Sequence, residues 1–91
     1  MDLTDLRREM DETDRALLAL FARRMALSGA IARVKQEAHL PVLDPRREEE
    51  KLRQAADSVP PELAEDARDL YRLLMAQSRA YQEKLLSGEV E

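Results

Sequence analysis

The sequence predicts an all-α protein, and three observations support this fold class. Leucine and alanine dominate the apolar residues, which make up 44% of the 91-residue chain. The chain has only 2 glycines and few β-branched residues, a composition that favours helix. The 4 prolines fall at two breaks and leave three uninterrupted segments. We therefore expect three helices per chain in a single domain spanning residues 1–91.

The first helix is predicted over about residues 4–38. Its apolar residues recur at three- and four-residue spacing, so they form one continuous stripe. The stripe comprises Leu3, Leu6, Met10, Leu17, Leu20, Leu27, Ile31 and Val34. Asp2 or Thr4 can serve as the N-cap. This part of the chain is therefore one long helix with an apolar face.

The two shorter helices are bounded by prolines. Asp44 followed by Pro45 is an N-cap residue with proline at the first helical position, which predicts a second helix over about residues 45–58. A second proline break precedes the third helix, which begins at Pro61 and is expected over about residues 61–87.

The length of the first helix predicts a homodimer. At 1.5 Å per residue it is about 52 Å long, whereas a compact chain of this size is only about 31 Å across. The rest of the chain is too small to cover the apolar stripe, and a second copy related by a two-fold axis is the simplest cover. If two first helices cross antiparallel near residue 18, residue 7 of one chain lies level with residue 29 of the other.

Composition excludes several classes of protein. The 15 Lys and Arg residues against 19 Asp and Glu give a net charge of -4, which disfavours nucleic-acid binding. With no cysteine and 1 histidine, disulfides, a catalytic thiol and zinc-finger ligands are excluded. No apolar run approaches the roughly 18 residues of a membrane span, and no signal peptide is recognisable. We expect a cytoplasmic protein without a membrane partner.

Arg24 lies on the apolar stripe, between Leu20 and Leu27, where an unpaired buried charge is costly. Ser28 and Lys35 follow four and eleven residues later, so all three fall within about 40° of one another around the helix. Two cations and a hydroxyl thus share one face. The alternative interpretation is that Arg24 reaches solvent at the edge of the stripe or fixes the register of helix pairing.

The other helices carry matching polar residues. Ser78 and Gln82 lie one turn apart on the apolar face of the third helix. Asp44, Arg47 and Glu48 are spaced so that one cation and one or two carboxylates can face a common target. Together with the cations of the first helix, these side chains suit a small polyanion that carries a hydroxyl group.

In this order and spacing, the sequence resembles the all-helical chorismate mutase family. The matching residues are Leu6-Arg7, Asp11 to Asp14 ahead of Leu17-Leu18-Ala19-Leu20, Arg23-Arg24, Lys35, Pro41-Val42-Leu43-Asp44-Pro45-Arg46-Arg47-Glu48, Ser78 and Gln82. The resemblance covers nearly the whole chain. It implies conversion of chorismate to prephenate for phenylalanine and tyrosine synthesis, without metal or cofactor. It also implies an intertwined antiparallel homodimer with shared active sites.

The resemblance implies four catalytic residues. Lys35 is expected at a substrate carboxylate and at the ether oxygen, and Gln82 at the same oxygen from the other side. Arg24 is expected to bind a carboxylate. Glu48 is expected to accept a hydrogen bond from the ring hydroxyl.

Further binding residues follow from the same resemblance. The partner chain's Arg7 is expected at the second carboxylate, and Ser78 is expected to donate to a carboxylate. Asp44 and Arg47 are expected to support the hydroxyl end of the site.

Two alternative functions stay open at this point. Isochorismate-pyruvate lyase is similar in fold and in its cationic residues, but the loop over residues 44–48 looks like the mutase version. A non-enzymatic helical dimerisation or regulatory domain is the other alternative. In that case Arg24 and Lys35 only fix the register of the helices.

Overall fold

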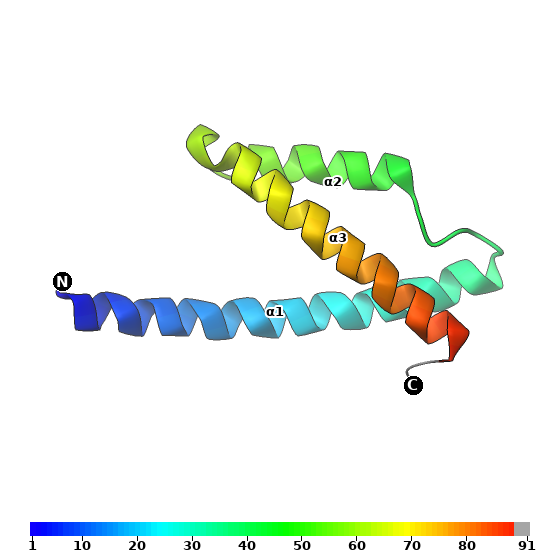
Figure 1. Ribbon diagram of the computed structural model, residues 1–91, viewed down its shortest axis with the longest axis horizontal. Helices are drawn as coiled ribbons and strands as arrows, with labels where there is room; N and C mark the ends of the chain where they lie inside the picture. The colour runs from blue at the N-terminus through cyan, green and yellow to red at the C-terminus, as the bar shows by residue number, and fades with distance from the viewer. Residues whose placement is uncertain (89–91) are drawn as a thin grey trace.

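The computed structural model describes residues 1–88, and its regular structure is helical throughout that range. The elements are α1 (Leu3–Glu37), α2 (Pro45–Asp57), a 3₁₀ turn η1 (Pro61–Leu63) and α3 (Ala64–Ser87), as Figure 1 shows. The all-helical prediction is confirmed for this range. Residues 89–91 of the predicted domain lie outside the described part. No helix within residues 1–88 is long and apolar enough to cross a membrane.

α1 begins one residue before its predicted start and ends one residue before its predicted end. The Asp2 carboxylate accepts a hydrogen bond of 2.9 Å from the amide three residues on, so Asp2 rather than Thr4 is the N-cap. At the other end His39 has a positive φ of 56°. The amide of Leu40 donates to the carbonyl of Lys35 at 2.8 Å, which completes a Schellman motif.

Prolines precede or begin the other helices. Asp44 caps α2 by accepting a hydrogen bond of 3.2 Å from the amide three residues on, and Pro45 follows at the first helical position. α2 ends one residue before its predicted end. The predicted first turn of the third helix is instead η1, closed by a 2.9 Å hydrogen bond from the Leu63 amide to the Pro60 carbonyl. Such 3₁₀ turns are common at helix N-termini, and α-helical bonding begins one turn later than predicted.

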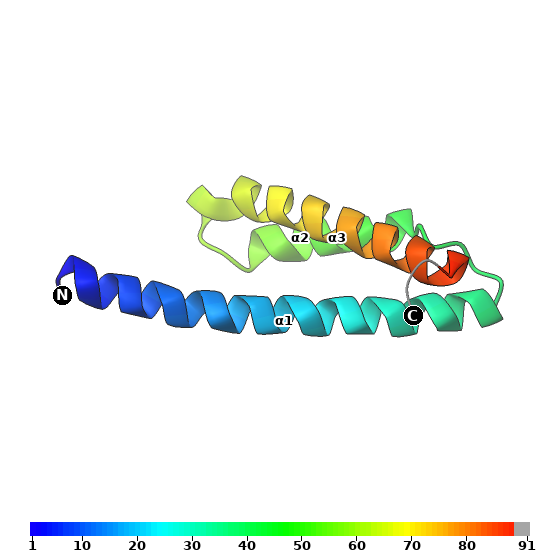
Figure 2. The same ribbon diagram turned by 60° about the horizontal axis from the view of Figure 1, so that its bottom comes forward.

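α3 is the central element, because it crosses the C-terminal half of α1 and also packs along α2 (Figures 1 and 2). Within residues 1–88, α1 and α2 do not pack against each other. The N-terminal end of α1 projects beyond the other helices (Figures 1 and 2). The chain measures 53 × 30 × 15 Å, with a radius of gyration of 16.2 Å. A compact chain of this length would have a radius of gyration of about 12 Å.

The buried core of the single chain is small. Within residues 1–88, the buried apolar side chains are Ala32, Ala55, Ala56 and Met75. The eight apolar residues of the predicted α1 stripe all have exposed fractions between 49% and 64%. One chain therefore leaves this stripe open to solvent, and the homodimer predicted to cover it stays a prediction.

Candidate active site

A cavity of about 490 Å³ lies where the three helices and the connection between α1 and α2 meet. Its lining residues are Arg24, Leu27, Ser28, Ile31, Lys35, Val42, Asp44, Arg47, Glu48, Lys51, Met75, Ser78, Arg79 and Gln82. Each helix contributes polar side chains, so the arrangement depends on how α3 packs against both α1 and α2.

The cavity brings together seven of the eight predicted site residues. These seven are Arg24, Lys35, Asp44, Arg47, Glu48, Ser78 and Gln82. Arg7 lies outside the cavity, exposed on the N-terminal half of α1. The individual roles that the resemblance implies for these residues stay predictions.

The hydroxyl of Ser78 is held by two residues of α1. Arg24 Nη1 donates to Ser78 Oγ at 2.7 Å, and Ser28 Oγ donates to the same oxygen at 3.0 Å. A hydroxyl accepts two hydrogen bonds and donates one, so the proton of Ser78 is available to a ligand. The Arg24 guanidinium also lies 5.7 Å from the ring centre of Tyr71, within the range of a cation–π contact.

Gln82 lies one turn after Ser78 and is buried on the same face of α3. Its Nε2 donates to the backbone carbonyl of Ser28 at 3.0 Å, which fixes the side-chain amide. An amide nitrogen has two N–H groups, so one donor is left for a ligand. Within residues 1–88, every buried side-chain polar atom has a hydrogen-bond partner.

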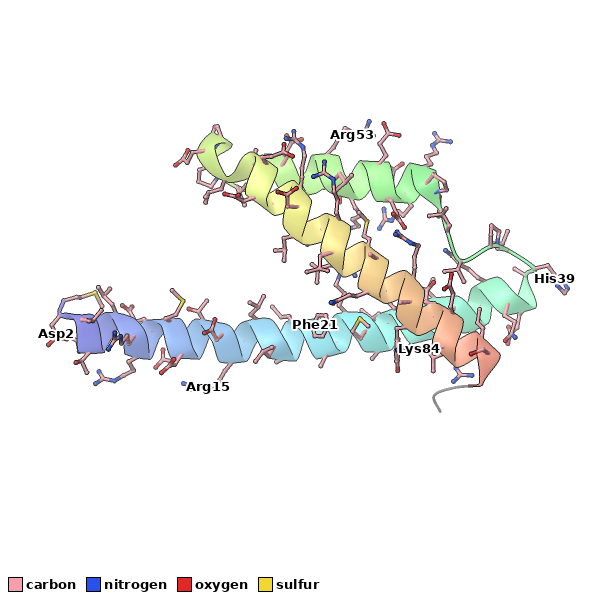
Figure 3. All side chains as sticks on the ribbon, viewed as in Figure 1. Asp2, Arg15, Phe21, His39, Arg53 and Lys84 are labelled. Carbon is pink, nitrogen blue, oxygen red and sulfur yellow. The ribbon has the colours of Figure 1, made fainter. Side chains whose placement is uncertain are left out.

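Lys35 is half-buried in the last turn of α1. Its Nζ donates to the carbonyl of Val42 at 2.8 Å, so the connection between α1 and α2 holds the ammonium in the cavity. This connection starts at His39, which lies at the end of α1 where the chain turns towards α2 (Figure 3). An ammonium has three donors, and two of them remain for a ligand.

Glu48 forms an ion pair with Arg79, a residue that the sequence analysis did not identify. Arg79 Nη1 lies 2.5 Å from both carboxylate oxygens of Glu48. The side chains are half-buried, with exposed fractions of 33% for Arg79 and 25% for Glu48. Arg79 directly follows Ser78 in α3, so the two side chains leave the helix about 100° apart around its axis. Helical spacing within one element cannot reveal this pair, because it depends on the packing of α2 against α3.

The first turns of α2 supply further charges to the cavity. The Asp44 carboxylate is used as the N-cap, and Arg47 pairs with Glu50 at 3.5 Å. Lys51 also lines the cavity, and its Nζ donates to Gln54 at 3.2 Å. Lys51 was not predicted as a site residue, because it belongs to the charged run over residues 46–51, a pattern typical of a solvated helix face.

Positive charge predominates in the cavity over the part of the chain that the structure describes. Five cationic side chains and two carboxylates line it: Arg24, Lys35, Arg47, Lys51 and Arg79 against Asp44 and Glu48. Among residues 1–88, no three His, Cys, Asp or Glu side chains come together to hold a metal ion. Cations, free hydroxyl and amide donors, and one carboxylate acceptor suit a small polyanion that also carries a hydroxyl group.

Comparison with known sequences identifies one family. The pattern of the family described as chorismate mutase type II matches residues 6–83. A T-protein of Enterobacter agglomerans is 41% identical over 70 residues, which cover 71% of this chain and 19% of that protein. A chorismate mutase of Methanocaldococcus jannaschii is 37% identical over 46 residues, which cover 50% of this chain and 46% of that protein. The aligned part is therefore less than half of the length of these relatives.

A solved structure has a similar fold. It is a conserved hypothetical protein from Pyrococcus furiosus, which superposes with a TM-score of 0.74 at 32% sequence identity. The superposition covers 88% of this chain and 93% of the other.

Proposed function

The chain belongs to the chorismate mutase type II family, and we propose that it converts chorismate to prephenate. The observation that carries this proposal is that Lys35 and Gln82 both line the cavity, and each has N–H donors that its hydrogen bond within the protein leaves for a ligand. The reaction is a rearrangement within one molecule: an ether C–O bond breaks while a C–C bond forms. It therefore needs no nucleophile and no proton transfer from the protein.

Binding would select the reactive shape of the substrate. Arg24 and the free proton of Ser78 can hold one carboxylate, and Glu48 can accept a hydrogen bond from the ring hydroxyl at the α2 side. Fixing both ends favours the chair-like conformer in which the two reacting carbons approach each other.

Lys35 and Gln82 would stabilise the transition state. Negative charge grows on the ether oxygen as its bond to carbon breaks, and donors already in place lower the energy of that charge. A million-fold acceleration requires about 8 kcal/mol. One well-placed donor supplies roughly 3 to 4 kcal/mol, so two donors together with conformer selection can account for it.

We further infer that the active protein is a homodimer. Its support is the exposed α1 stripe and the position of Arg7, which lies outside the cavity of its own chain. In an antiparallel pair of α1 helices, the partner chain's Arg7 would lie level with residue 29, between Arg24 and Lys35. Each dimer would then contain two equivalent shared sites. The cytoplasmic location expected from the sequence stays a prediction.

The test is to mix the purified protein with chorismate, follow the loss of its ultraviolet absorbance and identify the product. We expect prephenate, and we expect Lys35→Ala to lower kcat by about 100-fold or more. Lys84→Ala is the matched control, because Lys84 is an exposed lysine of α3 outside the cavity.

A folded protein that leaves chorismate unchanged contradicts the proposal. The same assay with isochorismate would then test the lyase alternative. For a structural module, replacing both Arg24 and Lys35 by leucine would leave dimerisation equal or stronger, since removing buried charges together is often stabilising.

A further inference from the structure

Glu48 and Asp44 are the two carboxylates that line the cavity within residues 1–88, and the fold uses them differently. Asp44 accepts a backbone hydrogen bond as the N-cap of α2. Glu48 is bonded, among the described residues, by the side chain of Arg79 alone. The position of the Glu48 carboxylate therefore depends on one residue of α3.

Glu48 shares its cavity with two cations that the proposed function assigns to the substrate: Arg24 at a carboxylate and Lys35 at the ether oxygen. Attraction between opposite charges is stronger in a half-buried cavity than in water. A Glu48 carboxylate without its own cation would pair with one of them. The substrate would then have to displace that pair before it could bind.

We infer that Arg79 is a positioning residue that holds Glu48 at the hydroxyl end of the site and away from Arg24 and Lys35. This inference rests on the proposed function. A carboxylate offers about four lone-pair positions, so the two contacts with Arg79 leave room for a hydrogen bond from the substrate hydroxyl. Arginine suits this task because its guanidinium is planar, always charged and able to hold both oxygens.

The experiment compares Arg79→Gln with the wild type in the presence of chorismate. Competition by a released Glu48 acts on the ground state, so we expect KM to rise about tenfold and kcat to change by less than about threefold. Arg79→Lys keeps the charge and should recover part of the wild-type KM. Arg72→Gln is the matched control, because Arg72 is an exposed arginine of α3 in an ion pair with Asp69.

A double-mutant cycle with Glu48→Gln tests whether Arg79 acts through Glu48. In that background we expect Arg79→Gln to change kcat/KM by less than about twofold, because the carboxylate that it positions is gone. An equal effect in both backgrounds would show that Arg79 acts on the substrate by itself, and it would overturn the inference.

Three further outcomes also decide against the inference. If Arg79→Gln lowers the melting temperature and kcat while KM stays unchanged, the pair only joins α2 to α3. If the wild type is active and Arg79→Gln matches it, the inference is wrong although the proposed function stands. A wild type without turnover removes the proposed function and this inference together.

Discussion

Arg24 Nη1 lies 2.7 Å from Ser78 Oγ, so a cation of α1 is oriented by a hydroxyl of α3 inside the cavity. The second hydrogen bond that Ser78 accepts, from Ser28 at 3.0 Å, comes from the same face of α1. A guanidinium has five donors, so this bond leaves Arg24 able to bind a carboxylate. The crossing of α1 and α3 therefore sets the direction of the cation.

Ser78→Ala should weaken catalysis more than stability. It removes both the acceptor that orients Arg24 and the free donor, so we expect kcat/KM to fall about 10- to 100-fold. The melting temperature should change little, because Ser28 can turn its hydroxyl to a carbonyl of its own helix. Ser87→Ala is the control, since Ser87 is exposed and bonds the backbone of α3. Unchanged kcat/KM in Ser78→Ala would contradict a binding role for this hydroxyl.

His39→Gly should stabilise the protein. His39 has a φ of 56° in the Schellman motif that ends α1, and glycine adopts this conformation without a steric penalty from Cβ. The left-handed conformation costs about 1 to 2 kcal/mol, and the backbone entropy that glycine loses offsets about 0.5 to 1 kcal/mol of this gain. We therefore expect the free energy of unfolding to rise by about 0.5 to 1 kcal/mol, measured by denaturant titration at a fixed protein concentration. His39→Ala keeps the Cβ atom and should give no gain. Equal effects of the two substitutions would show that backbone strain at residue 39 is unimportant.

Gly29→Leu should destabilise the crossing of α1 and α3. A Cβ atom at Gly29 would lie 2.9 Å from Leu85 Cδ1 and 3.6 Å from Tyr81 Cε2, so a larger side chain must push the helices apart. We expect a loss of about 1 to 3 kcal/mol in thermal or denaturant unfolding. Gly29→Ala is the control: it displaces only the flexible end of Leu85 and gains about 1 kcal/mol of helix propensity. A leucine variant as stable as the wild type would show that α1 and α3 do not approach each other closely at Gly29.

Much of the fold follows from local signals in the sequence. Asp2 and Asp44 are N-caps, and Pro45 stands at the first position of its helix, as such residues commonly do. The end of α1 lies within one residue of its prediction, but the Schellman motif that forms it was not predicted, because its left-handed position carries His39 instead of glycine. The 3₁₀ turn after Pro60 was not predicted either, since its apolar pattern is the same as that of an α-helix.

The candidate site was predictable where its residues interrupt an apolar face, or where their order and spacing match the family pattern, as in Asp44, Arg47 and Glu48. Arg24 and Gln82 stood out because each is polar on a face that is otherwise apolar, and the structure brings both to one cavity. Arg79 gave no such signal, because it pairs with Glu48 across two helices. The direction in which α3 packs on α2 depends on tertiary contacts, which helical spacing does not contain.

The proposed shared site has a direct test in mixed dimers. Arg7→Ala and Lys35→Ala should each be nearly inactive alone, because every site would lack one of the two cations. In a mixed dimer, one site combines the intact Arg7 of one chain with the intact Lys35 of the other. The second site of that dimer carries both defects.

Mixing the two inactive variants after unfolding and refolding them together should therefore restore activity. Random pairing makes about half of the dimers mixed, each with one intact site, so we expect about a quarter of the wild-type rate. Mixing Lys35→Ala with Ser78→Ala is the control: both residues line the cavity of one chain, so any rate should come from the residual Ser78→Ala sites alone. If the Arg7 and Lys35 variants stay inactive together although a mixed dimer is detected, Arg7 does not complete the partner's site. If Arg7→Ala alone has wild-type activity, each chain binds its substrate without the second copy.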